Sequence, residues 1–556
     1  MATTMDRDRD MDSQLPTEIN VVSLNCWGLK FISKLRNERL AEIGRRLAAA
    51  DPAPQIVGLQ ECWCQDDYLA IRRQTAHILP HGKFYYAGAF GAGLAILSRW
   101  PIEESTMFRY PLNGRPTAFW RGDWFVGKGV AVAKIRYGPG PEHVVEVFNT
   151  HTHAPYEEGR RVDTYFCHRL AQSWEFAKLM RAAASARGHL AVGLGDFNTP
   201  PALLTYRLLV AGAPGDPATA RDAWRVLHPD SSLGAYAHHA AERARGRPLP
   251  TAHYNLVENG ATSDSAYNTW RWSRARQRQL GRPRTAAAGV SSRHEVAPED
   301  PCPNGKRLDH VFVAGDTASW AVADARVGMV EPHPTLECSV SDHFSMEVRL
   351  VATRPPTSSH NNNNNRQGPT TTSASAGSGS AGGAAIKTPE EEEEELVHRG
   401  TYLKSPEGSL HSRGGDGASS YTARQGQGQG QQQHEVRLEG ELTADEYDTI
   451  LEEIRWYAER EVRQRRWRRI HFFAWVAALL ASLVGVWWSP HNYVAFILLL
   501  VCSLGLVAGT IDGLISLLFI GSEMRALQEF AWEVSNARAA LTGEQHFEEG
   551  TREKGW

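Results

Sequence analysis

Short apolar runs alternate with polar segments through most of the chain, and much longer apolar runs occur near its end. Apolar runs of about four to eight residues bounded by turn formers are typical of buried strands, whereas apolar positions spaced three and four apart predict helices. Candidate strands cover 19–25, 55–61, 93–98, 129–135, 144–150, 189–195, 309–313 and 344–350, and candidate helices cover 36–49 and 165–184. Strands alternating with a few helices predict a layered α/β or α+β domain with one continuous core.

We expect this domain to occupy residues 18–351 and to be soluble on its own, after a disordered N-terminus at 1–17. Residues 273–300, rich in Arg, Gln, Ala and Gly, are expected to form an inserted surface loop. Residues 352–435 contain an Asn run, a Gly/Ser/Ala tract, a Glu run and Gly-Gln repeats. Such sequence cannot bury enough apolar surface to offset the entropy of ordering, so it predicts a disordered linker.

The apolar runs near the end of the chain predict a hairpin of two transmembrane helices. A charged helical pattern at 436–469 leads into apolar residues 470–488, and a second apolar run at 493–520 contains a single charge, Asp512. Each run can cross a bilayer core of about 30 Å as a helix. The alternative is a pair of buried helices in a soluble domain, but soluble core helices seldom stay uncharged over such a length.

A cluster of arginines just before the first apolar run suggests the orientation of this hairpin. The cluster consists of Arg463, Arg465, Arg466, Arg468 and Arg469, and the polar connector between the runs contains no Lys or Arg. By the positive-inside rule, the domain, both termini and the tail at 521–556 are expected on the cytoplasmic side. The same arginines could bind anionic lipid. The organelle stays open, because endoplasmic reticulum and mitochondrial membranes are both compatible.

Charge and cysteine usage narrow the class of protein further. The formal net charge of −3 argues against a general polyanion binder, so no nucleic-acid partner is expected. The seven cysteines are odd in number, scattered and without the paired spacing of a zinc site. The first residues lack the apolar core of a signal peptide. Together these features favour a reduced soluble part that faces the cytosol.

Polar clusters follow several of the candidate strands. They contain Asn25, Glu61, Asn149-Thr150-His151, Gly195-Asp196-Phe197-Asn198 and Ser341-Asp342-His343. Each is weak alone, because Asp and Asn also form turns and a Ser-Asp-His sequence is more often a cap. At strand ends, however, their side chains can converge on one rim. Carboxylate, amide and imidazole groups together suit metal-assisted phosphoryl transfer, with Mg²⁺ held by one or two carboxylates.

The order of these clusters resembles the endonuclease/exonuclease/phosphatase family over about residues 18–351, with the clusters at 195–198 and 341–343 as its most specific marks. The resemblance implies a four-layer sandwich, in which two packed β-sheets are flanked by helices. It implies that Glu61 holds Mg²⁺ with help from Asn25. It also implies that His343 activates the attacking water, and we expect the adjacent Asp342 to fix its tautomer and raise its basicity.

The same resemblance assigns the remaining site residues. Asp196 and Asn198 would position the water and the phosphate, and His151 would stabilise the developing negative charge. A segment with the sequence Arg-Leu-Asp-His resembles the family's Arg-(Ile/Leu)-Asp-Tyr strand and places Asp309 at the site. His310 stands where the family has Tyr.

Several stretches, together with the hairpin, resemble the neutral sphingomyelinase branch of this family and its fungal inositol phosphosphingolipid phospholipase C members. These stretches are 61–63, 168–175, 260–270 and 305–309. The resemblance implies a hydrolase that acts on a membrane phosphosphingolipid and releases ceramide and a phosphorylated headgroup. Inositol phosphate and phosphocholine headgroups both stay open. The alternatives are an endonuclease or inositol polyphosphate phosphatase of the same fold, and an inactive membrane scaffold.

Residues 122–128 fit the first seven positions of a phosphate-loop pattern, but Gly129, at the eighth, replaces the Ser or Thr that would bind Mg²⁺. A strand pattern follows, so no nucleotide is expected. The sphingomyelinase branch has a phosphate-loop-like segment here, with an Asp and a Lys five residues apart that match Asp123 and Lys128. By resemblance this pair is a switch at the mouth of the site, with an anionic phospholipid as activator. A surface hairpin with a chance ion pair is the alternative.

Overall fold

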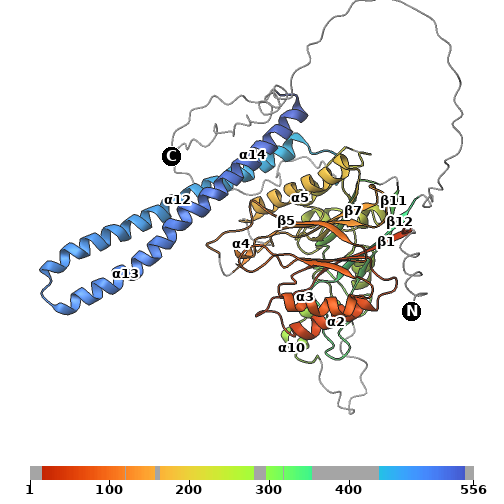
Figure 1. Ribbon diagram of the computed structural model, residues 1–556, viewed down its shortest axis with the longest axis horizontal. Coiled ribbons are helices and arrows are strands. Elements are labelled where there is room, and N and C mark those ends of the chain that lie inside the picture. Colours follow the sequence, from red (N-terminus) through yellow and green to blue (C-terminus); the bar gives the residue numbers. More distant parts are fainter. Residues whose placement is uncertain are drawn as a thin grey trace, which may run out of the picture.

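The computed structural model describes residues 15–118, 121–156, 163–213, 215–280, 296–316, 319–353 and 438–544. Within these ranges the chain forms two six-stranded sheets with helices on their outer faces and a long helical hairpin that projects from one side (Figure 1). The expected N-terminal segment up to residue 14, most of the inserted loop (281–295), the linker from 354 to 437 and the end of the tail from 545 lie outside the described residues.

The first sheet combines strands from both ends of the domain. Its order is β11 (Trp320–Gly328), β12 (Ser345–Ala352), β1 (Glu18–Asn25), β2 (Ile56–Gln60), β4 (Ala95–Ser98) and β3 (His81–Phe84). β1 runs antiparallel to β12 and parallel to β2. The carboxyl ends of β1 and β2 therefore meet at one edge of the sheet.

The second sheet also contains one parallel pair. Its order is β5 (Ile102–Arg109), β6 (Gly129–Arg136), β7 (Val144–His151), β8 (Leu190–Asp196), β10 (Asp309–Ala314) and β9 (Arg221–Asp222). β7 and β8 are parallel, and β10 is antiparallel to β8. The carboxyl ends of β7 and β8 thus lie beside the amino end of β10.

Three apolar clusters define four layers and confirm the predicted sandwich. The central cluster lies between the sheets, where residues such as Ile56 and Leu194 are fully or almost fully buried. A second cluster packs α2 (Arg36–Ala48) and α3 (Gln65–Thr75) on the first sheet. A third packs α5 (Phe166–Ala186) and α6 (Leu204–Val210) on the second sheet. The remaining short helices of the domain are α4 (Asp123–Val126), α7 (Ala223–Leu227), α8 (Ala240–Ala244), α9 (Ala252–Val257), η2 (Thr269–Arg271) and α10 (Arg274–Gln277).

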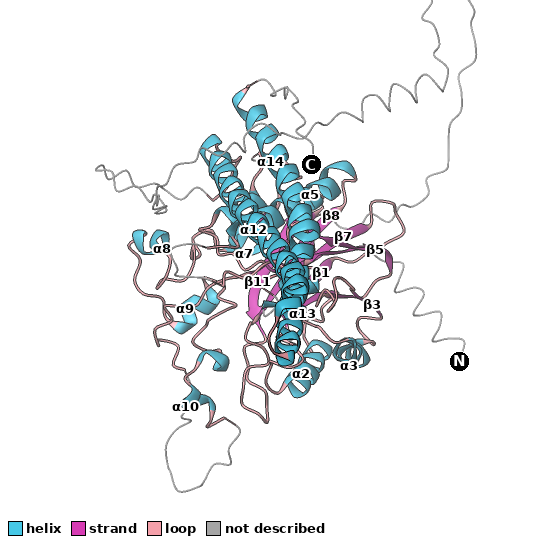
Figure 2. Ribbon diagram, turned by 90° about the vertical axis from the view of Figure 1, so that its left-hand side faces the viewer, coloured by secondary structure: helices cyan, strands magenta, loops and turns pink. Residues whose placement is uncertain are grey.

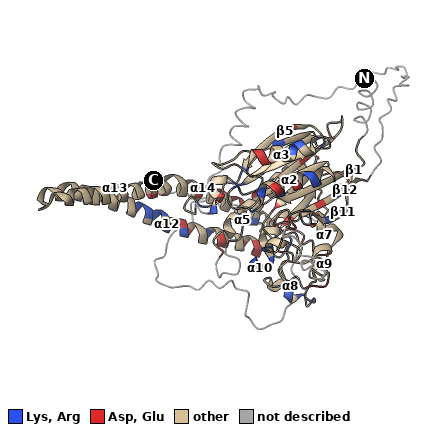
Figure 3. Cartoon of the chain, turned by 90° about the horizontal axis from the view of Figure 1, so that it is seen from below, with Lys and Arg blue, Asp and Glu red and all other residues tan. Residues whose placement is uncertain are grey.

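The two long C-terminal helices have the length and composition of membrane spans. α12 (Ala444–Gly485) joins the charged segment and the first apolar run in one helix, followed by η3 (Val486–Trp488). The return helix comprises α13 (Asn492–Leu514), a π-helical turn η4 (Ile515–Phe519) and α14 (Ile520–Thr542). Their most apolar windows are only 0% and 17% buried, which argues against a role as core helices of a soluble domain. Figure 3 shows basic side chains gathered on α12 and a largely uncharged α13.

Asp512 pairs with side chains of the first helix at the end of the hairpin nearest the domain. It pairs with Arg468 of α12, and His471 Nδ1 lies 2.8 Å from Asp512 Oδ2. The charge within the second apolar run is therefore compensated by groups on the first helix, as buried or membrane charges require.

The hairpin packs directly on the two-sheet sandwich, which the sequence did not reveal. Figure 2 shows α12 and α14 passing side by side over α5. Leu170 and Trp174 of α5 form an apolar cluster with Ile454 of α12 and Phe530 of α14. Lys178 Nζ of α5 also lies 2.6 Å from Glu533 of α14. The linker therefore connects two parts that are already in contact.

A buried polar group crosses this junction. Tyr457 Oη of α12 donates to Glu523 Oε1 of α14 at 2.7 Å, and His168 Nε2 of α5 lies 3.2 Å from the same oxygen. Arg115 Nε donates to Tyr457 Oη at 3.2 Å. Burial raises the pKa of Glu523 to about 7, and burial together with Arg115 lowers the pKa of His168 to about 3. The two neighbouring groups are therefore both neutral near pH 6.

Candidate active site

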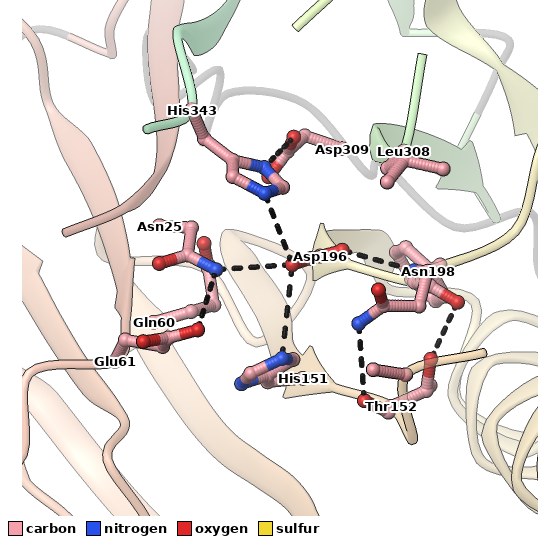
Figure 4. Close-up of polar contacts among 12 residues, drawn as sticks. Asn25, Gln60, Glu61, His151, Thr152, Asp196, Asn198, Leu308, Asp309 and His343 are labelled. Atoms are coloured by element: carbon pink, nitrogen blue, oxygen red, sulfur yellow. Dashed lines mark hydrogen bonds and ion pairs between the residues drawn. The ribbon is translucent and has the colours of Figure 1, made fainter. Parts of the chain in front are cut away.

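The strand register brings the sequence-predicted polar residues to one end of the sandwich (Figure 4). In the first sheet Asn25 pairs with Gln60, which places Glu61 at the next position. In the second sheet Asp196 pairs with His151 on one side and with Asp309 on the other. The ends of both sheets thus meet around Asp196, which is almost fully buried.

Asn25 connects the two sheets at the centre of the site. Its Nδ2 donates to Glu61 Oε1 at 3.2 Å and to Asp196 Oδ2 at 3.0 Å, while Oδ1 accepts from the Trp27 amide at 3.0 Å. One amide group therefore holds two carboxylates from different sheets in fixed positions.

Unusual backbone geometry allows this close approach. Glu61 has φ of 52°, and its carbonyl accepts from the Gly28 amide at 2.9 Å. A Cβ at Gly28 would lie 2.4 Å from Glu61 O, so only glycine fits there. Gly195, with φ of 145°, similarly lets β8 approach β7, because an added Cβ would lie 2.0 Å from Thr150 O. Strained positions of this kind cluster at functional sites.

The partner of His343 is Asp309, which corrects the expectation that Asp342 orients this ring. His343 Nδ1 donates to Asp309 Oδ2 at 2.8 Å, whereas Asp342 Oδ1 is 3.5 Å from Ser341 Oγ. The contact that orients the ring therefore comes from the start of β10 and not from the residue that precedes His343. Asp342 instead contributes charge near Glu61. His343 Nε2 faces Asp196 Oδ2 at 3.9 Å.

His151 and Asn198 complete the ring of groups around Asp196. His151 Nε2 lies 3.7 Å from Asp196 Oδ2, and the Asn198 amide donates to Asp196 Oδ1 at 2.9 Å. Asn198 Nδ2 donates to Thr152 O at 3.3 Å. Every sequence-predicted catalytic group therefore contacts Asp196 or a partner of Asp196, apart from Asp342.

Burial and the repulsion between neighbouring carboxylates shift the pKa values of the titratable groups at the site. Burial raises the pKa of Glu61 to about 7, and the Asp342 carboxylate adds to this rise. Burial raises the pKa of Asp196 to about 6, which His343 opposes. Burial alone would lower the pKa of His343, but Asp309 and Asp196 outweigh it and hold the pKa well above its usual range. The cluster thus has an excess of carboxylates that a cation would stabilise.

The donor set fits a hard divalent cation. Asp196, Asp309 and His343 place one ligand atom each within 4.8 Å of one another and could hold a metal ion. Within the described residues, Glu61 Oε2 and Asp309 Oδ1 are buried and have no hydrogen-bond partner. Buried carboxylate oxygens without partners are costly, and Mg²⁺ prefers such ligands.

Asp123 and Lys128 form a buried pair behind His151. Asp123 Oδ1 lies 3.5 Å from Lys128 Nζ, and the two side chains are 7% and 4% exposed. Lys128 Nζ also donates to Thr152 O at 3.0 Å, which adjoins His151. Asp123 Oδ2 accepts from Tyr156 Oη at 2.6 Å. This burial is incompatible with a chance ion pair on a surface hairpin.

The sequence did not indicate the hydrogen bonds of Asn149 and His310 that support the site. Asn149, from the predicted Asn-Thr-His cluster, donates to Leu59 O at 3.0 Å and Ala95 O at 2.9 Å and so ties β7 to the other sheet. His310 donates through Nε2 to Thr199 O at 2.9 Å and accepts from Arg307 Nη1 at 3.1 Å. It therefore supports the loop after Asn198 rather than the reacting groups. In the sequence, only the positions of Asn149 and His310 within predicted strands could have indicated these supporting roles.

The chain thus combines a two-sheet sandwich with a cluster of carboxylates and a histidine at its strand ends, and this cluster could hold a metal ion. Residues 22–343 match the Endonuclease/Exonuclease/phosphatase family, and this chain belongs to it. The suspected branch is also confirmed by curated relatives. The inositol phosphosphingolipids phospholipase C of Schizosaccharomyces pombe is 40% identical over 344 residues, 61% of this chain and 70% of the relative.

Two further relatives extend this comparison. The inositol phosphosphingolipids phospholipase C of Saccharomyces cerevisiae is 29% identical over 557 aligned positions, 95% of this chain and 92% of the relative. A putative neutral sphingomyelinase of Drosophila melanogaster is 27% identical over 60% of both chains. The Saccharomyces cerevisiae match includes the hairpin as well as the sandwich.

Proposed function

We propose that the protein is a Mg²⁺-dependent phospholipase C-type phosphodiesterase that hydrolyses membrane phosphosphingolipids. The observation that carries this proposal is the similarity to an inositol phosphosphingolipid phospholipase C over 95% of the chain, which spans both the site and the hairpin. The hairpin packs on α5 and so keeps the site close to a bilayer, where such a substrate resides.

Glu61 is the proposed Mg²⁺ ligand, and Asn25 fixes its orientation. Asp196, Asp309 and Asp342 contribute negative charge around the same position. When bound, the cation supplies charge neutralisation for the phosphate. The unpartnered Glu61 Oε2 supports this assignment.

The protein residues have distinct proposed roles in the hydrolysis. The His343–Asp309 dyad is the proposed general base, and Asp309 fixes the tautomer that leaves Nε2 facing the cluster. A bound cation would offset the carboxylate charge that holds the pKa of His343 high, so that Nε2 could accept a proton from the attacking water. Asp196 and Asn198 position the water and the phosphate, and His151 stabilises the developing negative charge. A P–O bond forms to water, the P–O bond to the ceramide oxygen breaks, and that oxygen takes up a proton. The products are ceramide and a phosphorylated headgroup.

We further propose that the catalytic domain faces the cytoplasm. The arginine cluster on α12, from Arg463 to Arg469, precedes the first span and fits the positive-inside rule. It is also the proposed site for an activating anionic phospholipid. Asp123 and Lys128 are the proposed switch, because Lys128 binds the backbone carbonyl next to His151.

Headgroup release by the full-length protein in proteoliposomes tests this function. Vesicles containing either inositol phosphosphingolipid or sphingomyelin should yield ceramide and the matching phosphorylated headgroup, and their relative rates would decide headgroup choice. Glu61→Gln and His343→Ala should abolish release while leaving thermal unfolding close to wild type. Hydrolysis of nucleic acid or inositol polyphosphates without lipid hydrolysis would refute the proposal.

A further inference from the structure

Two loops beside the candidate site expose large apolar side chains. In the β1–α2 loop (residues 26–35), Phe31 and Ile32 are 92% and 71% exposed. In the β3–β4 loop (residues 85–94), Phe90 is 64% exposed. Scattered apolar residues are normal on protein surfaces, but neighbouring exposed aromatic and aliphatic residues indicate an interaction site.

The β1–α2 loop is held in this shape by a fully buried arginine. Arg39 donates to Trp27 O at 2.8 Å and Lys34 O at 2.8 Å, and its guanidinium lies 4.6 Å from the centre of the Trp27 ring. Both ends of the loop are therefore fixed to α2. The exposed tip with Phe31 begins only a few residues after Asn25 of the site.

The β3–β4 loop connects to the membrane hairpin through a row of aromatic rings. The Phe90 amide donates to Phe125 O of α4 at 3.2 Å, and the two rings are 5.7 Å apart. The adjacent Trp124 ring lies 4.8 Å from Phe519, at the end of the second apolar run. Figure 1 shows α4 at the edge of the sandwich that faces the hairpin. Because aromatic rings at the end of a span mark the bilayer interface, this row places Phe90 near the membrane surface.

The two loops are neighbours on the rim of the site. The Gly28 amide of the β1–α2 loop donates to Glu61 O at 2.9 Å, and the Cys62 amide donates to Gly93 O of the β3–β4 loop at 3.0 Å. The segment that contains the proposed metal ligand thus lies between them. Apolar contact made by both loops would surround the entrance to the site.

The charge of the β1–α2 loop fits a bilayer surface. Lys30 and Lys34 are exposed and flank Phe31 and Ile32. Interfacial segments insert apolar side chains at the headgroup boundary while basic side chains contact lipid phosphates. A lipid surface therefore fits both the apolar and the basic side chains of the loop.

We propose that the β1–α2 and β3–β4 loops insert Phe31, Ile32 and Phe90 into the interface of the bilayer that holds the hairpin. Insertion directs the mouth of the site toward lipid phosphate groups. The orienting consequence rests on the proposed function, but the membrane contact itself does not require turnover.

The membrane contact can be measured on the full-length protein in vesicles of zwitterionic and anionic phospholipids. Cys64 is intermediate in exposure and all other cysteines are buried, so a Cys64→Ser background permits single labelling. An environment-sensitive fluorophore would be attached in Phe31→Cys, Phe90→Cys and, as the matched control, Leu249→Cys, which is 43% exposed beside α9. Probes at 31 and 90 should be quenched by lipid-borne quenchers and protected from aqueous iodide, and the probe at 249 should show the reverse. Equal iodide quenching at 31, 90 and 249 would overturn the proposal, whether or not the protein hydrolyses lipid.

Turnover tests the consequence separately. Phe31→Ser with Ile32→Ser should raise KM for vesicle substrate by about tenfold or more, because less apolar area is buried in the interface. Turnover of a monomeric water-soluble analogue should not change. The control, Leu249→Ser with Val257→Ser, should leave both substrates unaffected. Equal losses on vesicles and analogue would overturn an interfacial role, whereas absence of lipid hydrolysis in wild type would refute only the proposed function.

Discussion

His343 Nδ1 donates to Asp309 Oδ2 at 2.8 Å, so the proposed base on the segment before β12 is oriented by the first residue of β10. These residues are far apart in sequence but adjacent at the strand ends. Asp342, the sequence neighbour of His343, contributes charge near Glu61 instead. Two carboxylates beside one imidazole therefore have separable effects.

Asp309→Asn should lower kcat by about 100-fold or more at saturating Mg²⁺, because the amide can stabilise the wrong tautomer of His343. Asp342→Asn should instead raise the Mg²⁺ concentration required for half-maximal rate, with a smaller effect on kcat. Steady-state kinetics across a Mg²⁺ titration separate the two effects. The same kinetic defect in both variants would contradict the assignment of Asp309 as the orienting group.

Removal of divalent cations should abolish hydrolysis. Chelation with EDTA leaves the carboxylates around Glu61 without compensation, and added Mg²⁺ should restore the rate. Ca²⁺ should substitute poorly because it is larger and less strict in geometry. Rates in EDTA with back-titrated Mg²⁺ or Ca²⁺ provide the measurement. Full activity in EDTA would exclude a metal-dependent mechanism.

Lys128→Ala should strongly reduce activity on vesicles while membrane association stays intact. Lys128 is buried and binds the carbonyl next to His151, so its loss frees Asp123 and the His151 backbone together. Lys134→Ala is the matched control, because Lys134 lies on β6, the strand that follows Lys128, and pairs with Glu104, which is 68% exposed. The thermal unfolding of each variant should be measured alongside its kinetics. ATP should neither bind to the protein nor change its turnover. If Lys128→Ala and Asp123→Ala both keep more than about half of wild-type activity, the pair is not a switch.

The buried strands and the residues at the rim of the site were predictable, because an apolar run followed by polar residues marks them in the sequence. β2 and β8 are apolar throughout and end in the polar residues that form the site. β5 was missed because most of its residues are exposed, so no apolar run marks it. The Asp309–His343 bond was missed because pairing between distant strands is not encoded in local spacing. The packing of α14 on α5 was likewise hidden, since polar residues separate its buried positions.

A fragment that ends at residue 353 should be less soluble and less stable than the sequence suggested. Removing α12 and α14 exposes Leu170 and Trp174 of α5 to water, together with the other members of that cluster. Exposing each fully buried apolar side chain to water costs about 1.5 to 3 kcal/mol in transfer free energy. Size-exclusion chromatography and thermal unfolding would compare the fragment with the full chain in detergent. A monomeric fragment with unchanged thermal stability and full turnover of a soluble analogue would contradict this expectation.

Glu523 should contribute less to the stability of the junction between α5, α12 and α14 as pH rises from about 4.5 to 7. Burial raises the pKa of Glu523 to about 7, above the value of about 4.3 for an exposed glutamate. Over this range the folded junction holds a proton that the opened state has released, so the stability contribution is present at low pH and lost as pH rises through 7. Glu523→Gln removes this titration while keeping an acceptor for Tyr457 Oη. The variant should therefore resist opening better than wild type at pH 8, by up to about 3 kcal/mol, and equally at pH 4.5.

Hydrogen exchange of the α14 amides, corrected for the intrinsic pH dependence, measures this difference on the full-length protein. His168 has a pKa lowered to about 3 in the folded protein, so acid also opens the junction. That contribution comes first from burial and then from Arg115, so it is shared by wild type and Glu523→Gln and cancels in their difference. Glu529→Gln is the matched control, because Glu529 is an exposed residue of the same helix. Protection that differs between wild type and Glu523→Gln by the same amount at pH 4.5 and pH 8 would show that Glu523 does not titrate in the junction.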